Sequence, residues 1–174
     1  MPYTTTITGD EPVSLTEAKE YLRVFSLDED DLIASLIEAA REWAETHTEK
    51  AIVEQTVIAY YDAPSRRLEL PLGNATTLTS VTNSGEAVNA KLLVGNPSVV
   101  EITADNLPTA TGESQSVVVT YKAGYTVAPL RIKQAILLLV ADMYENREAQ
   151  VVGQTISQNQ TLERLLFPVR ELGL

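Results

Sequence analysis

Few side chains in this sequence are of the kinds that perform catalysis or bind metals. The chain has no cysteine, which excludes disulfides, thiolate nucleophiles and cysteine-ligated metal sites. His47 is the single histidine, and no nucleophilic serine motif accompanies it. Phosphate-loop, dinucleotide-binding, H-E-x-x-H and G-x-S-x-G motifs do not occur. We therefore expect a protein that is not an enzyme and that needs no cofactor or metal.

Carboxylates are the abundant titratable groups, and two sets of them need a chemical interpretation. Residues 28–31, Asp-Glu-Asp-Asp, lack the alternating ligands and the glycine of a calcium loop. We interpret this run as the start of a helix, where the helix dipole favours negative charge. Glu69 and Glu101 lie on separate predicted strands and are the conceivable pair for a hydrolase. Because nothing in the sequence fixes their separation, hydrolysis is the least favoured functional class.

A non-catalytic ligand-binding or adhesion module is the alternative function that the sequence leaves open. It would be built on the β-rich middle of the chain and would need an exposed aromatic patch. The candidate residues for this patch are Tyr60, Tyr61, Tyr121 and Tyr125. Tyrosines on strands more often pack against neighbouring strands, so cross-strand packing is the favoured interpretation.

A helix predicted over Pro129–Arg147 is the element around which the chain is organised. Proline suits its first position, because a proline lacks the N–H that would be unpaired there. Residues 135–141, AILLLVA, are apolar over about two turns, so the helix is apolar on every side. This stretch is too short to cross a membrane. It must therefore be covered on all sides, either by its own fold or by neighbouring copies.

Two further helices are predicted before residue 50. Ser14 and Glu17 have the spacing of a capping box, which begins the first helix. The acidic run at 28–31 begins the second helix, in which apolar residues from Leu32 to Ala44 recur at helical spacing. His47 lies near the end of this helix, where the dipole favours a basic group. The Thr-rich residues 1–11 are expected to form an extended arm.

The hydrophobic pattern changes between residues 51 and 126 to about six short runs rich in Val, Ile, Thr and Tyr. Turn sequences such as Leu-Gly-Asn at 72–74 and Asn-Ser-Gly-Glu at 83–86 separate them. This pattern predicts a small antiparallel sandwich or barrel. The predicted fold class is α+β, with a helical-bundle core and a small antiparallel β domain inserted between the second and third main helices.

The predicted organisation has three parts. Residues 1–50 form the N-terminal arm and the first two helices, and residues 51–126 form the inserted β-rich domain. Residues 127–174 contain the long core helix, a polar loop at 148–160 and a C-terminal docking segment, TLERLLFPVREL. This last segment can dock on its own core or in a groove of a neighbour, and the sequence leaves both alternatives open.

The net charge of −11 is unevenly distributed. Residues 1–50 hold 12 acidic and 4 basic residues, whereas residues 129–174 hold 5 of each. A surface this acidic is unsuited to binding nucleic acid tightly, because such binding requires clustered Lys and Arg. It would still let a polyanion slide past without being bound.

Three segments together resemble the head–tail connector (adaptor) family of tailed bacteriophages and related prophages. They are VSLTEAKEYLRV at 13–24, DEDDLIASLIEAAREWAETHT at 28–48 and YKAGYTVAPLRIKQAILLLVADMYENRE at 121–148. The resemblance implies a structural virion protein, without catalysis, that forms a ring typically of twelve subunits under the portal. Such a ring extends the DNA channel and provides the platform for the stopper and tail. The implied location is the virion neck, and the host cytoplasm during assembly.

A ring requires two different contact surfaces on each subunit, because its contacts are heterologous. The candidates for contact with the portal or with another subunit are Arg131, Lys133, Arg147, Arg164, Leu166, Phe167 and Arg170. The candidates for an acidic lining of the channel are Glu38, Glu42, Glu45 and Glu49. The expected partners are further copies of the chain, the portal protein, a stopper or tail-completion protein, and double-stranded DNA that passes without specific binding. No membrane is expected to take part.

Overall fold

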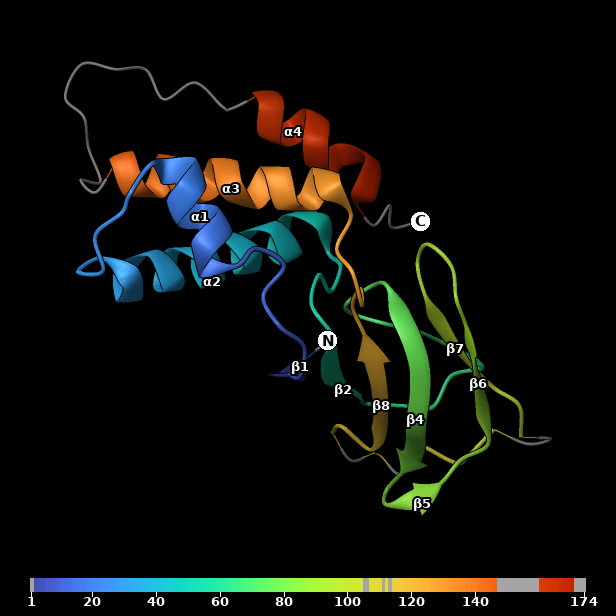
Figure 1. Ribbon diagram of the computed structural model, residues 1–174. Helices are drawn as coiled ribbons and strands as arrows, with labels where there is room; N and C mark the ends of the chain where they lie inside the picture. The colour runs from blue at the N-terminus through green and yellow to red at the C-terminus, as the bar shows by residue number, and fades with distance from the viewer. Residues whose placement is uncertain (1, 105–106, 111, 113, 147–159, 171–174) are drawn as a thin grey trace. The chain divides into compact units, whose positions relative to one another are not determined.

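The computed structural model of the protein describes residues 2–104, 107–110, 112, 114–146 and 160–170. These residues divide into two units, which we describe separately (Figure 1). The β unit consists of the described parts of residues 2–10 and 49–126. The helical unit consists of the described parts of residues 11–48 and 127–170. The strands between α2 and α3 are inserted into the helical sequence, as predicted.

Two antiparallel sheets make up the described part of the β unit. The five-stranded sheet has the order β1-β2-β8-β4-β5, and the three-stranded sheet has the order β3-β7-β6. The strands of the first sheet are β1 (Tyr3–Ile7), β2 (Gln55–Tyr61), β8 (Val117–Ala123), β4 (Ala75–Asn83) and β5 (Glu86–Ala87). Those of the second sheet are β3 (Arg67–Glu69), β7 (Val99–Ile102) and β6 (Ala90–Leu93).

The two sheets share one hydrophobic core. Alternate residues of β2 and β8 are buried, as expected for strands with one face inward. Val57 and Tyr121 from the larger sheet belong to the same buried cluster as Leu68 and Val100 from the smaller one. The predicted alternatives were a sandwich or a barrel, and two sheets that enclose one core form a sandwich.

The N-terminal residues, which were expected to form an extended arm, are a strand of the larger sheet. Residues 3–7 of β1 pair antiparallel with residues 55–59 of β2. The main-chain N–H groups of Thr8 and Gly9 both donate to the carbonyl of Glu54, at 2.9 and 2.8 Å. A threonine-rich composition suits a strand as well as an arm. Sequence periodicity does not show which distant strand these residues pair with, so the pairing of β1 with β2 was not predicted.

The helical unit contains α1 (Leu15–Leu22), α2 (Asp30–Thr48), α3 (Leu130–Glu145), α4 (Gln160–Leu166) and the short 3-10 turn η1 (Phe167–Val169). The predicted capping box begins α1, because Glu17 N–H donates to the Ser14 hydroxyl and Ser14 N–H donates to the Glu17 carboxylate. The acidic run lies at the start of α2, as expected. None of the described helices is long and apolar enough to span a membrane.

Neighbouring elements of the same chain cover α3. It packs against α1, α2 and α4 (Figure 1). Its buried side chains occupy both sides of the helix and are Ile132, Ala135, Ile136, Leu137, Leu139 and Val140. All but Ile132 belong to the apolar run 135–141, so of the two ways to cover that run the chain's own fold accounts for most of it.

Candidate interaction surfaces

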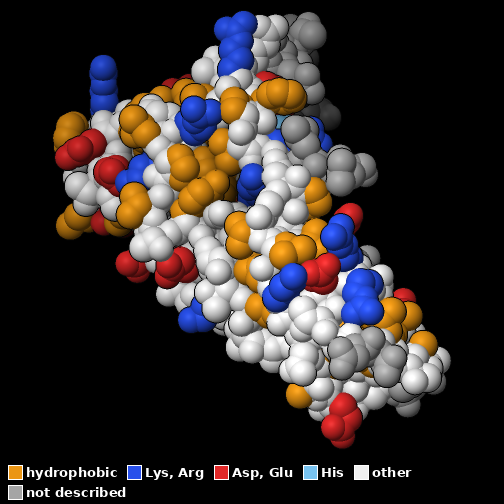
Figure 2. All heavy atoms as spheres, turned by 90° about the vertical axis from the view of Figure 1, so that its right-hand side faces the viewer, with side chains coloured by type: hydrophobic (Ala, Val, Ile, Leu, Met, Phe, Trp, Pro, Cys, Tyr) orange, Lys and Arg blue, Asp and Glu red, His pale blue; other side chains and the backbone are white. Residues whose placement is uncertain are grey.

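Exposed apolar side chains gather where α3 begins and α4 ends. Val127, Leu130 and Phe167 are between 62% and 78% exposed. An open, mainly apolar hollow of about 370 Å³ lies beside Phe167 and is also lined by Glu163, Arg164 and Pro168. We call this surface the α3–α4 socket and define it as Val127, Leu130, Phe167, Pro168 and the exposed cations Arg131, Arg164 and Arg170. Figure 2 shows hydrophobic side chains gathered beside lysine and arginine side chains in the helical part of the chain.

The end of α2 supports this socket. Trp43, which helical spacing placed on the apolar side of α2, is 39% exposed and stacks on His47 with ring centroids 4.8 Å apart. His47 Nε2 in turn lies 3.5 Å from a carboxylate oxygen of Glu163. The expectation for His47 was a helix-end position, and it lies in the last turn of α2. The contact between His47 and Glu163 links the end of α2 to α4, whose residues line the hollow.

A second apolar surface lies in the loop between α1 and α2. Phe25 is 87% exposed and Leu27 is 77% exposed. The loop is nevertheless well fixed, because Lys19 Nζ donates to the Ser26 carbonyl at 2.8 Å and also pairs with Asp30. Ser26 Oγ donates to Asp28 at 2.8 Å. We call residues 24–29 the α1–α2 knob, since a rigid loop here presents two large apolar side chains outward.

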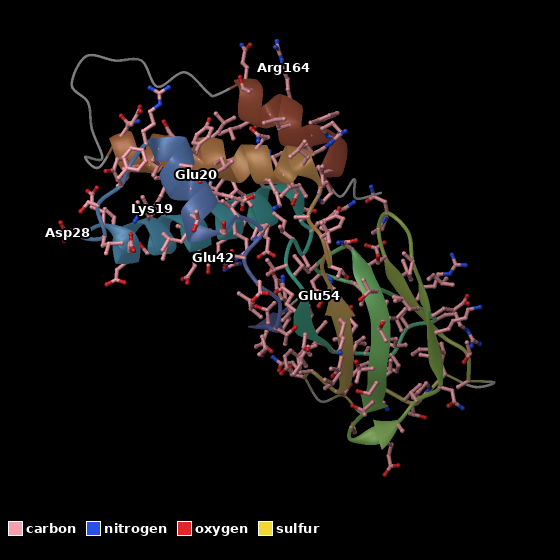
Figure 3. All side chains as sticks on the ribbon, viewed as in Figure 1. Lys19, Glu20, Asp28, Glu42, Glu54 and Arg164 are labelled. Carbon is pink, nitrogen blue, oxygen red and sulfur yellow. The ribbon has the colours of Figure 1, made fainter. Side chains whose placement is uncertain are left out.

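The knob and the socket lie at opposite ends of α3. Tyr144, in the last turn of α3, donates a hydrogen bond of 2.6 Å to Glu29 of the knob. Leu130 and Arg131 of the socket are in the first turn of α3. A helix of 16 residues is about 24 Å long at about 1.5 Å per residue. Figure 3 shows Asp28 at the tip of the α1–α2 loop and Arg164 extending outward from α4.

The four glutamates proposed for an acidic lining do not form one continuous face. Glu38 and Glu42 are exposed on α2. Glu45 is only 12% exposed, because Arg41 Nη1 donates to it at 3.0 Å. Glu49 follows the end of α2 with φ of 56°, so it leaves the helical stripe. Helical spacing alone groups Glu45 and Glu49 with the other two glutamates, because it takes no account of ion pairs or of the residue at which a helix ends.

The basic candidates also differ in their surroundings. Arg131, Arg164 and Arg170 are exposed, whereas Lys133 Nζ lies 3.7 Å from Glu17 of the same chain. Hydrogen bonds from Ser14, and then the charge of Lys133, lower the pKa of Glu17. Leu166 is fully buried in the helical unit, whereas Phe167 beside it is exposed. Arg147 lies outside the described residues.

The carboxylates proposed for a hydrolase are not arranged for one. Glu101 lies opposite Arg67 on β3, and Glu69 is two residues further along that strand. A hydrogen bond and the charge of Lys91, with the charge of Arg67, lower the pKa of Glu101. A general acid in glycoside hydrolysis needs a raised pKa instead. Within the described residues, no three His, Asp or Glu side chains are grouped to hold a metal.

The four tyrosines of the alternative module do not form an exposed patch. Tyr121 is fully buried, and its hydroxyl bonds the main chain of Leu72. Tyr60, Tyr61 and Tyr125 are half-buried. Cross-strand packing, the favoured interpretation, describes Tyr60, Tyr61 and Tyr121, because all three lie in the paired strands β2 and β8.

The knob is the surface that sequence reasoning missed. The acidic run at 28–31 predicted the start of α2, but that interpretation did not include the loop before it. The available signal was Phe25 and Leu27, two large apolar residues in a short connection between helices, where polar residues are usual.

The fold and its surfaces define an α+β protein with an inserted β-sandwich, whose most exposed apolar side chains lie in the connections and ends of its helices. The chain belongs to the head completion protein family, whose model matches residues 11–169. Comparison with curated protein sequences gave no match.

Solved structures share this fold over nearly the whole chain. One is a chain in the neck of an empty GTA particle computed with C6 symmetry, at 21% identity and a TM-score of 0.80, covering 98% of this chain and 97% of that chain. A second is in the virion of a native gene transfer agent (GTA) particle, at 20% identity and a TM-score of 0.79, covering 100% and 97%. A third is in the neck of a native GTA particle computed with C12 symmetry, at 20% identity and a TM-score of 0.76, covering 98% and 97%.

Proposed function

We propose that this chain is a non-catalytic structural subunit of the neck of a phage-like virion. In detail, it forms a head–tail connector (adaptor) ring that docks under the portal, extends the DNA channel and carries the stopper or tail. The observation that carries this proposal is the family match over residues 11–169, together with a fold shared over 98% of the chain with a subunit of a particle neck. The C12 symmetry of one such neck supports a ring of twelve copies.

The helical unit would form the bundle-type core of this ring. Its exposed cations Arg131, Arg164 and Arg170 would contact the portal or the next subunit, as would Arg147. Glu38 and Glu42, the two exposed glutamates of the four, would line the channel and repel the DNA that passes. Assembly would take place in the host cytoplasm, and the finished ring would remain in the virion neck.

The test is to remove the chain from the particle that carries it and to image the particles that form. We expect DNA-containing heads without tails, and we expect the chain supplied in trans to restore tailed particles. Particles that keep their tails without this chain would overturn the proposal.

Whether Arg131 contacts the portal rather than the next subunit is tested by reversing its charge. Arg131→Glu is the sharper variant, because Lys133 already pairs with Glu17 and its reversal would also disturb the start of α1. We expect Arg131→Glu to reduce co-sedimentation with purified portal, and Lys122→Glu, an exposed cation of the β unit, to leave it unchanged. If the wild type and both variants bind the portal equally, Arg131 is not part of the portal contact.

A further inference from the structure

We propose that the α1–α2 knob of one copy docks in the α3–α4 socket of the next copy. This inference rests on the proposed function in that it names the surfaces through which copies of the chain would join in a ring. It commits to one occupant of the socket, a second copy of the same chain, and to two apolar anchors, Phe25 and Leu27.

The knob presents two large apolar side chains to solvent. Phe25 and Leu27 are the two large apolar residues of one short loop, and burying either side chain would stabilise a complex by removing apolar surface from water. Their loop is held by Lys19, Ser26 and Asp28, so little conformational freedom is lost when it docks. Phe25 is 87% exposed, so it is not part of the core of its own unit.

The socket offers an apolar surface on which such a side chain can dock. The hollow beside Phe167 is shallow and open with a mainly apolar wall, and its volume of about 370 Å³ leaves room for one aromatic side chain to lie against it. Leu130 and Val127 extend the apolar surface beyond it. An aromatic anchor in a pocket with a charged rim is the usual arrangement of a strong protein–protein contact.

Charge identifies the partner as another copy. The rim of the socket carries three exposed cations, Arg131, Arg164 and Arg170, against one exposed carboxylate, Glu163, which lies 3.5 Å from His47. Asp28 in the knob and Asp31 just after it are exposed carboxylates, against one exposed cation, Arg23, just before it, so the knob region is acidic on balance. The two apolar surfaces therefore carry opposite charge, which favours docking of one on the other and disfavours a knob–knob or socket–socket pair.

The geometry excludes docking within one copy. Tyr144 holds the knob at the C-terminal end of α3, and the socket surrounds its N-terminal end, about 24 Å away along a helix of 16 residues. Two different surfaces at opposite ends of one rigid element make a heterologous contact. Such a contact repeats from copy to copy and closes into a ring if the rotation allows it.

The experiment uses the absence of native cysteine. Asp28→Cys and Arg164→Cys are made as separate full-length proteins, mixed and treated with a short bismaleimide. We expect a cross-linked pair in the mixture, and a ladder of cross-linked copies from the protein that carries both changes. The matched control is Val94→Cys mixed with Arg164→Cys, since Val94 is 72% exposed but lies in the β unit.

Sedimentation velocity provides the second measurement. Phe25→Ser and Phe167→Ser should each weaken self-association by on the order of tenfold to a hundredfold, whereas Val94→Ser should have no effect. Each variant keeps one intact surface, so an equal mixture of the two should form dimers and no larger species. Raising the salt concentration should weaken the wild-type association.

The outcomes separate this inference from the proposed function. An oligomer that forms without the 28–164 cross-link, and that Phe25→Ser leaves unchanged, would overturn the docking pair while leaving a ring in place. A monomer at every concentration, without cross-links, would also overturn the docking pair, and the ring would then be judged by the particle experiment alone. The expected cross-link together with normal tails in particles lacking the chain would refute the neck function and retain the contact.

Discussion

Arg41 on α2 forms an ion pair with Glu11, a residue 30 positions earlier in the chain, and its Nε donates to the two carboxylate oxygens at 2.9 and 3.0 Å. Arg41 is only 3% exposed, and its Nη1 also donates to Glu45 at 3.0 Å. Burial alone would lower the pKa of Arg41, but the hydrogen bond and charge of Glu11 and the charge of Glu45 raise it overall. The guanidinium therefore joins the segment before α1 to the middle of α2.

Removing this guanidinium should destabilise the helical unit. Arg41→Ala leaves a cavity and deprives two partly buried carboxylates of their partner, so we expect a loss of about 3–5 kcal/mol in the free energy of unfolding. Glu11→Ala should lose less, about 1–3 kcal/mol, because Glu45 still pairs with the cation. Urea unfolding monitored by circular dichroism measures both changes. Glu38→Ala, an exposed residue of the same helix, is the control, and three equal losses would refute the assigned role.

Two glycines offer a matched test of backbone strain. Gly124 has φ of 113°, and a Cβ there would overlap the carbonyl of Val53. Gly85, in the β4–β5 turn, has φ of 86° but open space around its Cα. We expect Gly85→Ala to cost about 1 kcal/mol and Gly124→Ala to cost more than about 3 kcal/mol or to prevent folding. Thermal unfolding compares the two, and a Gly124→Ala protein as stable as Gly85→Ala would contradict the close approach.

The buried hydroxyl of Tyr121 should stabilise the β unit. It donates to the Leu72 carbonyl at 3.0 Å and accepts from the Leu72 N–H at 3.3 Å. Tyr121→Phe keeps the ring but leaves these two buried groups without their partner, so we expect a loss of about 1–3 kcal/mol. Tyr60→Phe, on the neighbouring strand β2, should change stability by less than about 0.5 kcal/mol. Denaturant titrations that give equal midpoints for both variants would show that the hydroxyl is dispensable.

Glu17 should contribute a pH-dependent part of stability. Its pKa in the folded chain lies below the ordinary 4.5. A lowered pKa means that the folded state favours the ionised carboxylate, so the contribution is present above pH 4.5 and is lost as the pH falls through the folded-state pKa. Because the side chain is exposed, its size should be only about a few tenths of a kcal/mol.

Glu17→Gln isolates this contribution, because glutamine also completes a capping box. We expect the variant to unfold with a melting temperature that falls less steeply than that of the wild type as the pH is lowered from about 6 to about 3. Glu20→Gln alters another exposed carboxylate of α1 and serves as the control. An unchanged pH profile for Glu17→Gln would mean that the ionised form is not specifically stabilised.

Local patterns in the sequence determined the elements and their order. The capping box at Ser14 and Glu17, the acidic start of α2, the apolar run of α3 and the turn at 83–86 were all readable because each depends on residues within a few positions of one another. The insertion of strands between α2 and α3 followed from the order of these patterns. The excess of acidic residues and the lack of cysteine likewise came from the sequence alone.

Tertiary structure decided which of these residues reach a surface and with which partners. Pairing of β1 with β2, of Arg41 with Glu11 and of Lys133 with Glu17 all join positions 30 or more apart, and no local pattern reports them. The exposure of the knob was hidden for the same reason, whereas Phe167 and the cations of the socket were already predicted as contact residues and only their grouping was not. Whether an apolar side chain such as Phe25 or Phe167 is buried depends on what packs over it, and that is settled only when the helices assemble.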